Sequence, residues 1–343
     1  MRRERCSSLP ATRLAEWLYE AGIGENRAAL VQSGEIVEAQ VEFPGEIAAG
    51  SILGARLTHI LIPERRGIVS LRLGGKALLE PIPLKLTEGM ALRVEILREK
   101  ALETGRTKLP KCRATDVAER AGPTLLERVG ASGLTVAMLG PYSADRLQQL
   151  GWSHLLEEAG TGEIPFDGGA LRISLTPAMT LIDVDGPLEP RALAVAGAAA
   201  AGRAIRRLGI GGSIGIDLPT LPAKADRLAA AAALDAALPM PFERTAVNGF
   251  GFLQIVRRRE RASLAELVQG DPAGAAARSL LRQAERVPGG GERIIHGAPA
   301  VIERLREGPD WLQRLERHLG ATVRLREEPG LAIFGGHVHS QFQ

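Results

Sequence analysis

Cysteine is nearly absent from this chain of 343 residues, which contains only Cys6 and Cys112. Two isolated thiols make neither a disulfide framework nor a CxxC metal motif. The sequence therefore excludes the small disulfide-rich and zinc-finger classes. Since such cysteine usage fits a reducing compartment, we expect a cytoplasmic protein.

Long apolar runs are also missing. No stretch of about 18 uncharged apolar residues occurs, so we expect no membrane span. The most apolar stretch, 192–201, is alanine-rich and flanked by arginines, which indicates a buried helix. The first 17 residues begin with basic side chains but contain no apolar core, so we expect no secretory signal.

The chain also lacks a large excess of either charge. Its formal net charge is +3, from 43 basic and 40 acidic residues, so charge alone does not require a nucleic-acid partner. The basic residues are mostly arginine, which binds phosphate with two parallel hydrogen bonds. An excess of arginine and alanine also fits a GC-rich genome, and composition leaves both explanations open.

Short β-like runs dominate the first third of the sequence. After a helix that starts near residue 14, the runs 27–31 and 35–42 predict a β-hairpin. Further short runs separated by Gly and Pro follow between 50 and 113, a spacing typical of a small barrel. Residues 114–165 look helical and mixed, without a strong motif.

The second half alternates strands with helices. Apolar strands are predicted at 171–186, 211–218 and 244–252, with helices at 190–208 and 222–238 between them. This order implies parallel pairing through right-handed crossovers, that is, a parallel βαβαβ core of an α/β domain.

Two aspartates carry the strongest chemical signal. Asp183 and Asp217 each end an apolar strand, and one helical crossover joins the two strands. Because the carboxyl ends of parallel strands line the ligand crevice, the two carboxylates are expected side by side. Such a pair repels unless a cation neutralises it, and Mg²⁺ prefers carboxylate oxygens. Asp185 shares a strand face with Asp183 and is a candidate third ligand or water-positioning group. Alternatively, these aspartates are ordinary turn or cap residues.

Several segments around these acids are similar to the ribonuclease E/G family. They are GEIPFDGGALRISLTPAMTLIDVDG (162–186), AAGRAIRRLGIGGSIGIDL (200–218) and RTAVNGFGFLQIVRRR (244–259). The first resembles the family's strand ending in I-D-V/I-N-S, and the second its G-G-x-I-x-I-D-F. Residues 300–329 resemble the small final domain of the G-type members. The chain thus looks like a shortened, ribonuclease G-like member.

The resemblance implies a magnesium-dependent endoribonuclease that cleaves single-stranded RNA and leaves 5′-phosphate and 3′-hydroxyl ends. Asp183 and Asp217 match the family's Mg²⁺ ligands. Asp185 stands where the family has a catalytic asparagine, so the site has an extra negative charge. Arg244 matches an arginine near the scissile phosphate.

Residues 50–113 resemble a degenerate S1-type RNA-binding barrel. The resemblance makes Lys108 a candidate RNA contact there, and Arg257, Arg258 and Arg259 candidates for contacts with the RNA backbone. The family's aromatic pair has no counterpart in this barrel. Since stacking contributes about 1–3 kcal/mol per base, we expect weaker RNA binding.

Two further family features are absent. Residues 114–165 lack the R-T-A-G-like stretch that senses a 5′-monophosphate. No C-P-x-C element is present, so any homo-oligomer forms without a shared zinc. His337 and His339 alone are a weak metal signal, and we interpret them as surface residues.

The expected segments are 1–49, an N-terminal helix and β-hairpin of the core; 50–113, the S1-like barrel; 114–165, a shortened connecting region; 166–275, the magnesium-binding catalytic domain; and 276–343, a small C-terminal α+β domain.

Two alternative functions remain open. The first is a catalytically inactive RNA-binding or scaffold protein derived from the same family, which the missing sensor, zinc link and aromatics favour. The second is a haloacid-dehalogenase-like phosphatase, because IDVDG (182–186) contains a D-x-D arrangement. A glycine follows where that family has Thr or Val, and no later acidic pair is evident.

Overall fold

The computed structural model describes residues 15–103, 106–141 and 143–341. Cys6 and the basic N-terminal stretch lie outside the described residues. The chain forms a mixed α/β fold with a closed barrel and several separate sheets. None of the helices in the described part of the chain is long and apolar enough to cross a membrane.

The N-terminal sheet has four strands in the order β11-β1-β2-β3. Its strands are β1 (Glu16–Ala21), β2 (Asn26–Gln32), β3 (Glu35–Glu42) and β11 (Thr135–Leu139). The helix α1 (Leu125–Gly130) precedes β11 in the chain. The predicted hairpin is confirmed, with Ser33 and Gly34 at positive φ in its turn. The predicted initial helix is wrong, because residues 16–21 form β1. This strand is buried on both faces, so its apolar residues do not alternate and periodicity cannot identify it.

The predicted small barrel is confirmed as a closed barrel of five strands in the order β10-β6-β5-β4-β7. These strands are β4 (Ile52–Ile62), β5 (Arg66–Leu71), β6 (Lys76–Leu79), β7 (Ala91–Arg98) and β10 (Lys111–Ala114). A two-stranded hairpin, β8 (Ala101–Glu103) and β9 (Arg106–Lys108), extends outside the barrel. Cys112 lies in the barrel core, where burial raises the pKa of its thiol to about 12, so it is not a nucleophile at neutral pH.

A six-stranded sheet contains the candidate aspartates, in the order β12-β13-β14-β15-β17-β16. Its elements are β12 (Glu163–Phe166), β13 (Gly169–Leu175), β14 (Thr180–Asp185), α4 (Pro190–Arg207), β15 (Gly212–Asp217), α5 (Lys224–Ala237), β16 (Glu243–Arg244) and β17 (Phe252–Arg257). The strands β14 and β15 are parallel, with α4 as their crossover, as the sequence predicts.

The prediction of a fully parallel βαβαβ core is wrong in two places. The predicted strand 171–186 is a hairpin of β13 and β14, because Thr176 and Met179 hydrogen-bond to each other in a turn. The predicted strand 244–252 is mostly the turn of a second hairpin, which joins β16 to β17. The chain therefore reverses before β17, which pairs antiparallel with β15.

The remaining helices connect this sheet to a small C-terminal unit. They are α2 (Arg146–Gln149), α3 (Trp152–Thr161), α6 (Leu264–Gly270), α7 (Pro272–Arg286), α8 (Pro299–Glu307) and α9 (Trp311–Leu319). The C-terminal sheet has the order β19-β18-β20, with β18 (Glu292–Gly297), β19 (Val323–Glu327) and β20 (His337–Gln341). Asp310, with φ of 53°, lies between α8 and α9 and separates the two helices.

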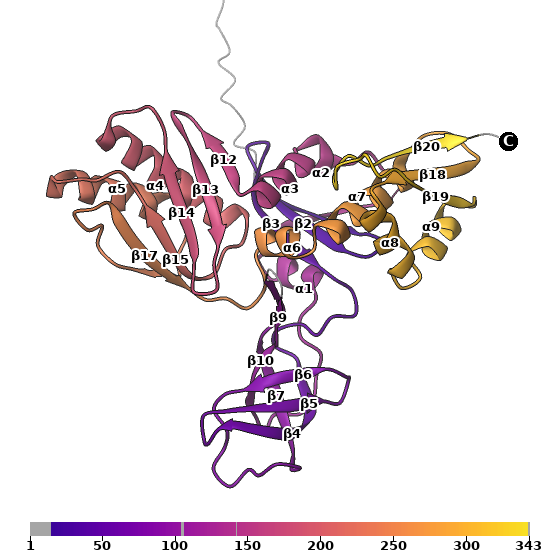
Figure 1. Cartoon of the computed structure of the whole chain (residues 1–343), viewed down its shortest axis with the longest axis horizontal. Coiled ribbons are helices and arrows are strands. Elements are labelled where there is room, and N and C mark those ends of the chain that lie inside the picture. Colours follow the sequence, from indigo (N-terminus) through magenta and orange to yellow (C-terminus); the bar gives the residue numbers. More distant parts are fainter. Residues whose placement is uncertain (1–14, 104–105, 142, 342–343) are drawn as a thin grey trace, which may run out of the picture.

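Figure 1 shows how these units are arranged. The barrel projects from the rest of the molecule, while the six-stranded sheet and the C-terminal sheet lie on opposite sides of the N-terminal sheet. One hydrophobic core joins the N-terminal sheet, α3 and the helix-covered side of the six-stranded sheet.

Candidate active site

The two faces of the six-stranded sheet have different surroundings. Ile182, Ile216 and Leu253 point to one face and are fully buried in the core that α4 and α5 share with the sheet. Because side chains alternate along a strand, their neighbours point to the other face. There Asp217 is exposed and Asp183 is partly exposed. We call this side the open face.

A cross-strand row of side chains crosses the open face. The register pairs each member directly with the next, over five neighbouring strands. In order, the row is Glu163, Arg172, Asp183, Asp217 and Phe252.

Asp183 and Asp217 are direct partners in the parallel register of β14 and β15. Neighbouring strands lie about 4.8 Å apart, so the two carboxylates are adjacent, as the strand-end pattern predicts. Among the residues that the structure describes, neither carboxylate has a hydrogen-bond or ion-pair partner. Two adjacent carboxylates that no described cation contacts repel each other, so they favour the binding of a metal ion between them.

Asp185 lies two residues beyond Asp183 on the same face of β14, and both of its carboxylate oxygens accept hydrogen bonds. Its Oδ2 accepts a hydrogen bond from Arg172 Nη1 at 3.1 Å, and its Oδ1 accepts one from the Gly186 amide at 3.1 Å. Arg172 also lies 3.9 Å from Glu163 Oε1. It is thus a cation beside the acids, and the sequence pattern did not indicate it, because its position depends on the unpredicted β13–β14 hairpin.

The turn between β16 and β17 lies against the end of β15, next to Asp217. The Oδ1 atom of Asn248 accepts hydrogen bonds from the amides of Phe250 and Phe252, each at 3.0 Å. Gly251, at φ 95°, approaches so closely that an added Cβ would be 2.1 Å from the Leu218 carbonyl oxygen. The turn leaves Phe250 82% exposed, two residues before Phe252, which is the register partner of Asp217. The sequence patterns did not indicate Phe250 as a candidate site residue.

Arg244 is not brought to the aspartates. It pairs with Ile255, whose side chain is buried, so Arg244 lies on the helix-covered face. Its Nε and Nη2 donate to Asp235 of α5 at 2.7 and 2.5 Å. This hydrogen bonding raises the pKa of Arg244 and lowers that of Asp235. The geometry is that of a structural ion pair.

The three consecutive arginines point in different directions. Arg257 donates to the Ile210 carbonyl at 3.3 Å, and burial lowers its pKa. Arg258 is exposed and lies 3.0 Å from Glu260, while Arg259 forms an ion pair with Glu266. They therefore do not form one continuous basic surface.

Lys108 lies on β9, outside the strands of the barrel. Its Nζ is 3.5 Å from the Pro177 carbonyl oxygen, at the turn that precedes β14. A small pocket there is lined by Lys108, Arg259 and Ser213. Since Ser213 precedes Asp217 by four residues on the same strand face, this pocket and the acids are about 13 Å apart along β15.

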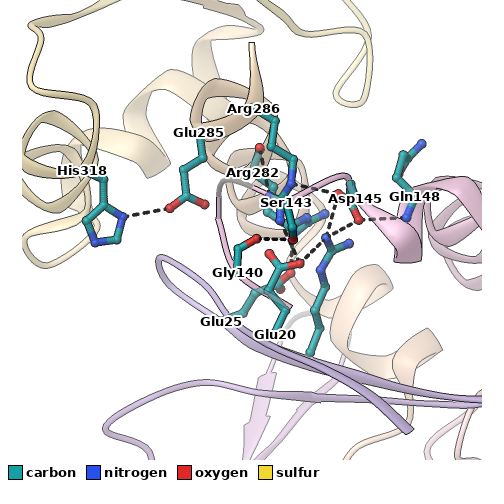
Figure 2. Close-up of polar contacts among 11 residues, drawn as sticks. Glu20, Glu25, Gly140, Ser143, Asp145, Gln148, Arg282, Glu285, Arg286 and His318 are labelled. Carbon is teal, nitrogen blue, oxygen red and sulfur yellow. Dashed lines mark hydrogen bonds and ion pairs between the residues drawn. The ribbon is translucent and has the colours of Figure 1, made fainter. Parts of the chain in front are cut away.

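A second dense group of charges lies where β1 and β2 meet α7 (Figure 2). Arg27 is 1% exposed and donates to Glu20 at 2.9 Å and to Asp145 at 2.8 Å. Burial tends to raise the pKa of Asp145, but Arg27, the Gln148 amide and Arg286 together lower it. We call this group the junction cluster, which consists of Glu20, Glu25, Arg27, Asp145, Arg282 and Arg286.

No model of a known protein family matches the chain, and no curated protein matches it either.

Proposed function

We propose that the chain is a magnesium-dependent endoribonuclease that cleaves single-stranded RNA, acting in RNA processing or decay in the cytoplasm. One observation carries the proposal: Asp183 and Asp217 are adjacent on an open face, and neither has a partner among the described residues. The resemblance of the surrounding segments to the ribonuclease E/G family adds the reaction type.

The donor set fits Mg²⁺. This ion is commonly held by one or two carboxylates and completes its shell with water and phosphate oxygens. Asp183 and Asp217 supply two carboxylates at one strand spacing, on a face that RNA can reach. When bound there, Mg²⁺ would neutralise charge on the phosphate and lower the pKa of a coordinated water.

The neighbouring side chains suit the remaining tasks. Asp185 is held by Arg172 and Gly186, so its carboxylate has a fixed position from which to orient the attacking water. The Nη2 atom of Arg172, which takes part in neither of these two contacts, is available to a phosphate oxygen. Phe250 offers an exposed ring on which one base can stack. The Lys108 pocket, about 13 Å from the acids along β15, suits a second backbone contact.

The reaction cleaves one bond. Water attacks phosphorus, the bond to the 3′ oxygen breaks, and that oxygen leaves with a proton. The products have 5′-phosphate and 3′-hydroxyl ends, as the family resemblance implies.

An inactive RNA-binding or scaffold protein is the second candidate. It is favoured by the loss of expected cationic contacts, because Arg244 and Arg259 are held in ion pairs. It leaves the bare pair of aspartates unexplained. A haloacid-dehalogenase-like phosphatase has less support, because Asp185, the second acid of its D-x-D arrangement, is engaged by Arg172.

The test is cleavage of an end-labelled single-stranded RNA with and without Mg²⁺. We expect Asp183→Asn and Asp217→Asn to lower the rate by about 100-fold or more, since each removes a transition-state charge contact. Melting temperatures should not fall, because neither carboxylate stabilises the fold. Asp185→Asn should be milder, since the related family has asparagine there.

The matched control is Asp310→Asn, an exposed acid in the C-terminal unit, which should cleave like the wild type. Near wild-type cleavage by either Asp183→Asn or Asp217→Asn would contradict the proposed site. RNA binding without cleavage at any Mg²⁺ concentration would favour the inactive alternative.

A further inference from the structure

Three of the six histidines of the chain gather on one face of the C-terminal sheet. His296 lies on β18 directly opposite His337 of β20, and His339 follows two residues later on the same face. The ring centroids are 4.6 Å apart for His296 and His337 and 5.0 Å apart for His296 and His339. One nitrogen atom from each ring lies within 4.8 Å of the others. The surface interpretation of His337 and His339 is thus incomplete, because it lacked His296.

His296 has the bonding pattern of a metal-binding imidazole. It is only 7% exposed, its Nδ1 contacts a carboxylate oxygen of Glu328, and its buried Nε2 has no hydrogen-bond partner among the described residues. An unpaired buried nitrogen costs free energy unless something binds it. In metal sites, the ligating histidine typically donates its other ring nitrogen to a carboxylate, which fixes the tautomer and the ring orientation.

The surroundings favour a transition metal over Mg²⁺. Imidazole nitrogens suit Zn²⁺, Cu²⁺ and Ni²⁺, whereas Mg²⁺ requires oxygen ligands. The charges on this face come from four residues: Arg326, which pairs with His296 in the register; Arg324 and Glu292, which lie 2.7 Å apart in an ion pair; and Glu328. Glu328 offsets the repulsion that Arg326 exerts on a cation.

We propose that His296, His337 and His339 bind one Zn²⁺ ion. Three protein ligands leave a tetrahedral ion with one open position, and the exposed rings of His337 and His339 put that position at the solvent. The ion links β20 to β18 and stabilises the C-terminal sheet. This site is independent of the proposed magnesium site, because it lies on a different sheet with different donors.

The test is whether the metal-free full-length chain binds zinc, which is measured by calorimetric titration and by thermal unfolding. We expect one Zn²⁺ per chain and a melting temperature that rises with Zn²⁺ until the site saturates. Millimolar Mg²⁺ should not displace the ion. Because His337 and His339 are exposed, His337→Gln and His339→Gln should fold normally and lose at least tenfold in affinity. Glu328→Gln should lose about 10–100-fold and keep the stoichiometry.

His59→Gln, an exposed histidine on the barrel, is the control and should bind zinc like the wild type. The proposal is overturned if zinc binding does not saturate at one ion per chain. It is also overturned if His337→Gln or His339→Gln binds as tightly as the His59→Gln control. Neither readout depends on ribonuclease activity, so the two proposals can fail separately.

Discussion

The open face of the six-stranded sheet and the junction cluster contain the same kinds of charged residue in opposite states. In the junction cluster, Arg27 lies between Glu20 and Asp145; Arg27 and Glu20 are buried, and Asp145 is partly buried. On the open face, Asp183 and Asp217 lie beside each other without a described partner. The number of charged residues therefore does not distinguish the two regions. What distinguishes them is whether these residues are paired and how exposed they are.

The difference separates structural charges from those available to a ligand. A buried charge is tolerated only when it is paired, because leaving water costs several kcal/mol per ion. Two bare acids persist only where water or a cation reaches them. By this criterion Arg244, paired with Asp235, belongs with the structural charges, although its sequence neighbourhood suggested a catalytic one.

Removing a cation from the junction cluster should have the largest effect on stability. Arg27→Ala leaves Glu20 buried with one partner fewer, so we expect the free energy of unfolding to fall by about 3–5 kcal/mol. Arg146→Ala, which removes an exposed pair with Glu16, should cost less than about 1 kcal/mol. Urea unfolding of both variants measures the difference.

Arg27→Lys covers the case in which Arg27→Ala does not fold. It keeps the charge but cannot bridge both acids with the guanidinium geometry, so we expect an intermediate loss. Equal losses for the Arg27 and Arg146 variants would remove the distinction between the two regions.

In the turn between β16 and β17, Phe250→Ala should weaken the proposed RNA binding without affecting the fold. Loss of one stacked base costs about 1–3 kcal/mol, which corresponds to a roughly 5- to 150-fold higher Kd. Fluorescence anisotropy with a short single-stranded RNA in the absence of Mg²⁺ measures this without cleavage. Leu228→Ala removes an exposed apolar side chain from α5, on the other side of the sheet, and should bind normally. Unchanged affinity in Phe250→Ala would exclude the stacking role.

The smallest effect is expected for Arg244→Gln. Because this arginine lies on the helix-covered face, RNA cleavage should stay within about threefold of wild type. Loss of its partly exposed pair with Asp235 should cost less than about 1 kcal/mol of stability. A rate reduction near 100-fold would instead restore Arg244 as a phosphate clamp.

Sequence patterns located the acids because their signal is local. Asp183 and Asp217 each end an apolar strand, and a helix-length segment lies between them, so their pairing follows from the right-handed crossover rule. The barrel was also predictable, since short strands separated by Gly and Pro recur along it. These features depend on residues close together in the chain.

The errors concern turns that apolar periodicity does not reveal and contacts between segments far apart in the chain. The turn at Thr176 and the turn at Asn248 each reverse the chain within what looks like one continuous strand. Arg172 could be placed beside the acids only once the first of these turns was known. His296 joins His337 only through the pairing of β18 with β20, and nothing near His296 in the sequence indicates it.

The adjacency of Asp183 and Asp217 depends on the register between β14 and β15. A shift of one residue would turn Asp217 toward α4 and α5 and bring a buried isoleucine to the open face. Ile214 and Ile216 resist that shift because they are fully buried in the core. A residue inserted in the loop after α4 would leave the proposed metal site in place, whereas the same insertion inside β15, before Asp217, would turn Asp217 to the other face of the sheet. The ability to bind a cation is thus also a test of whether this sheet has assembled correctly.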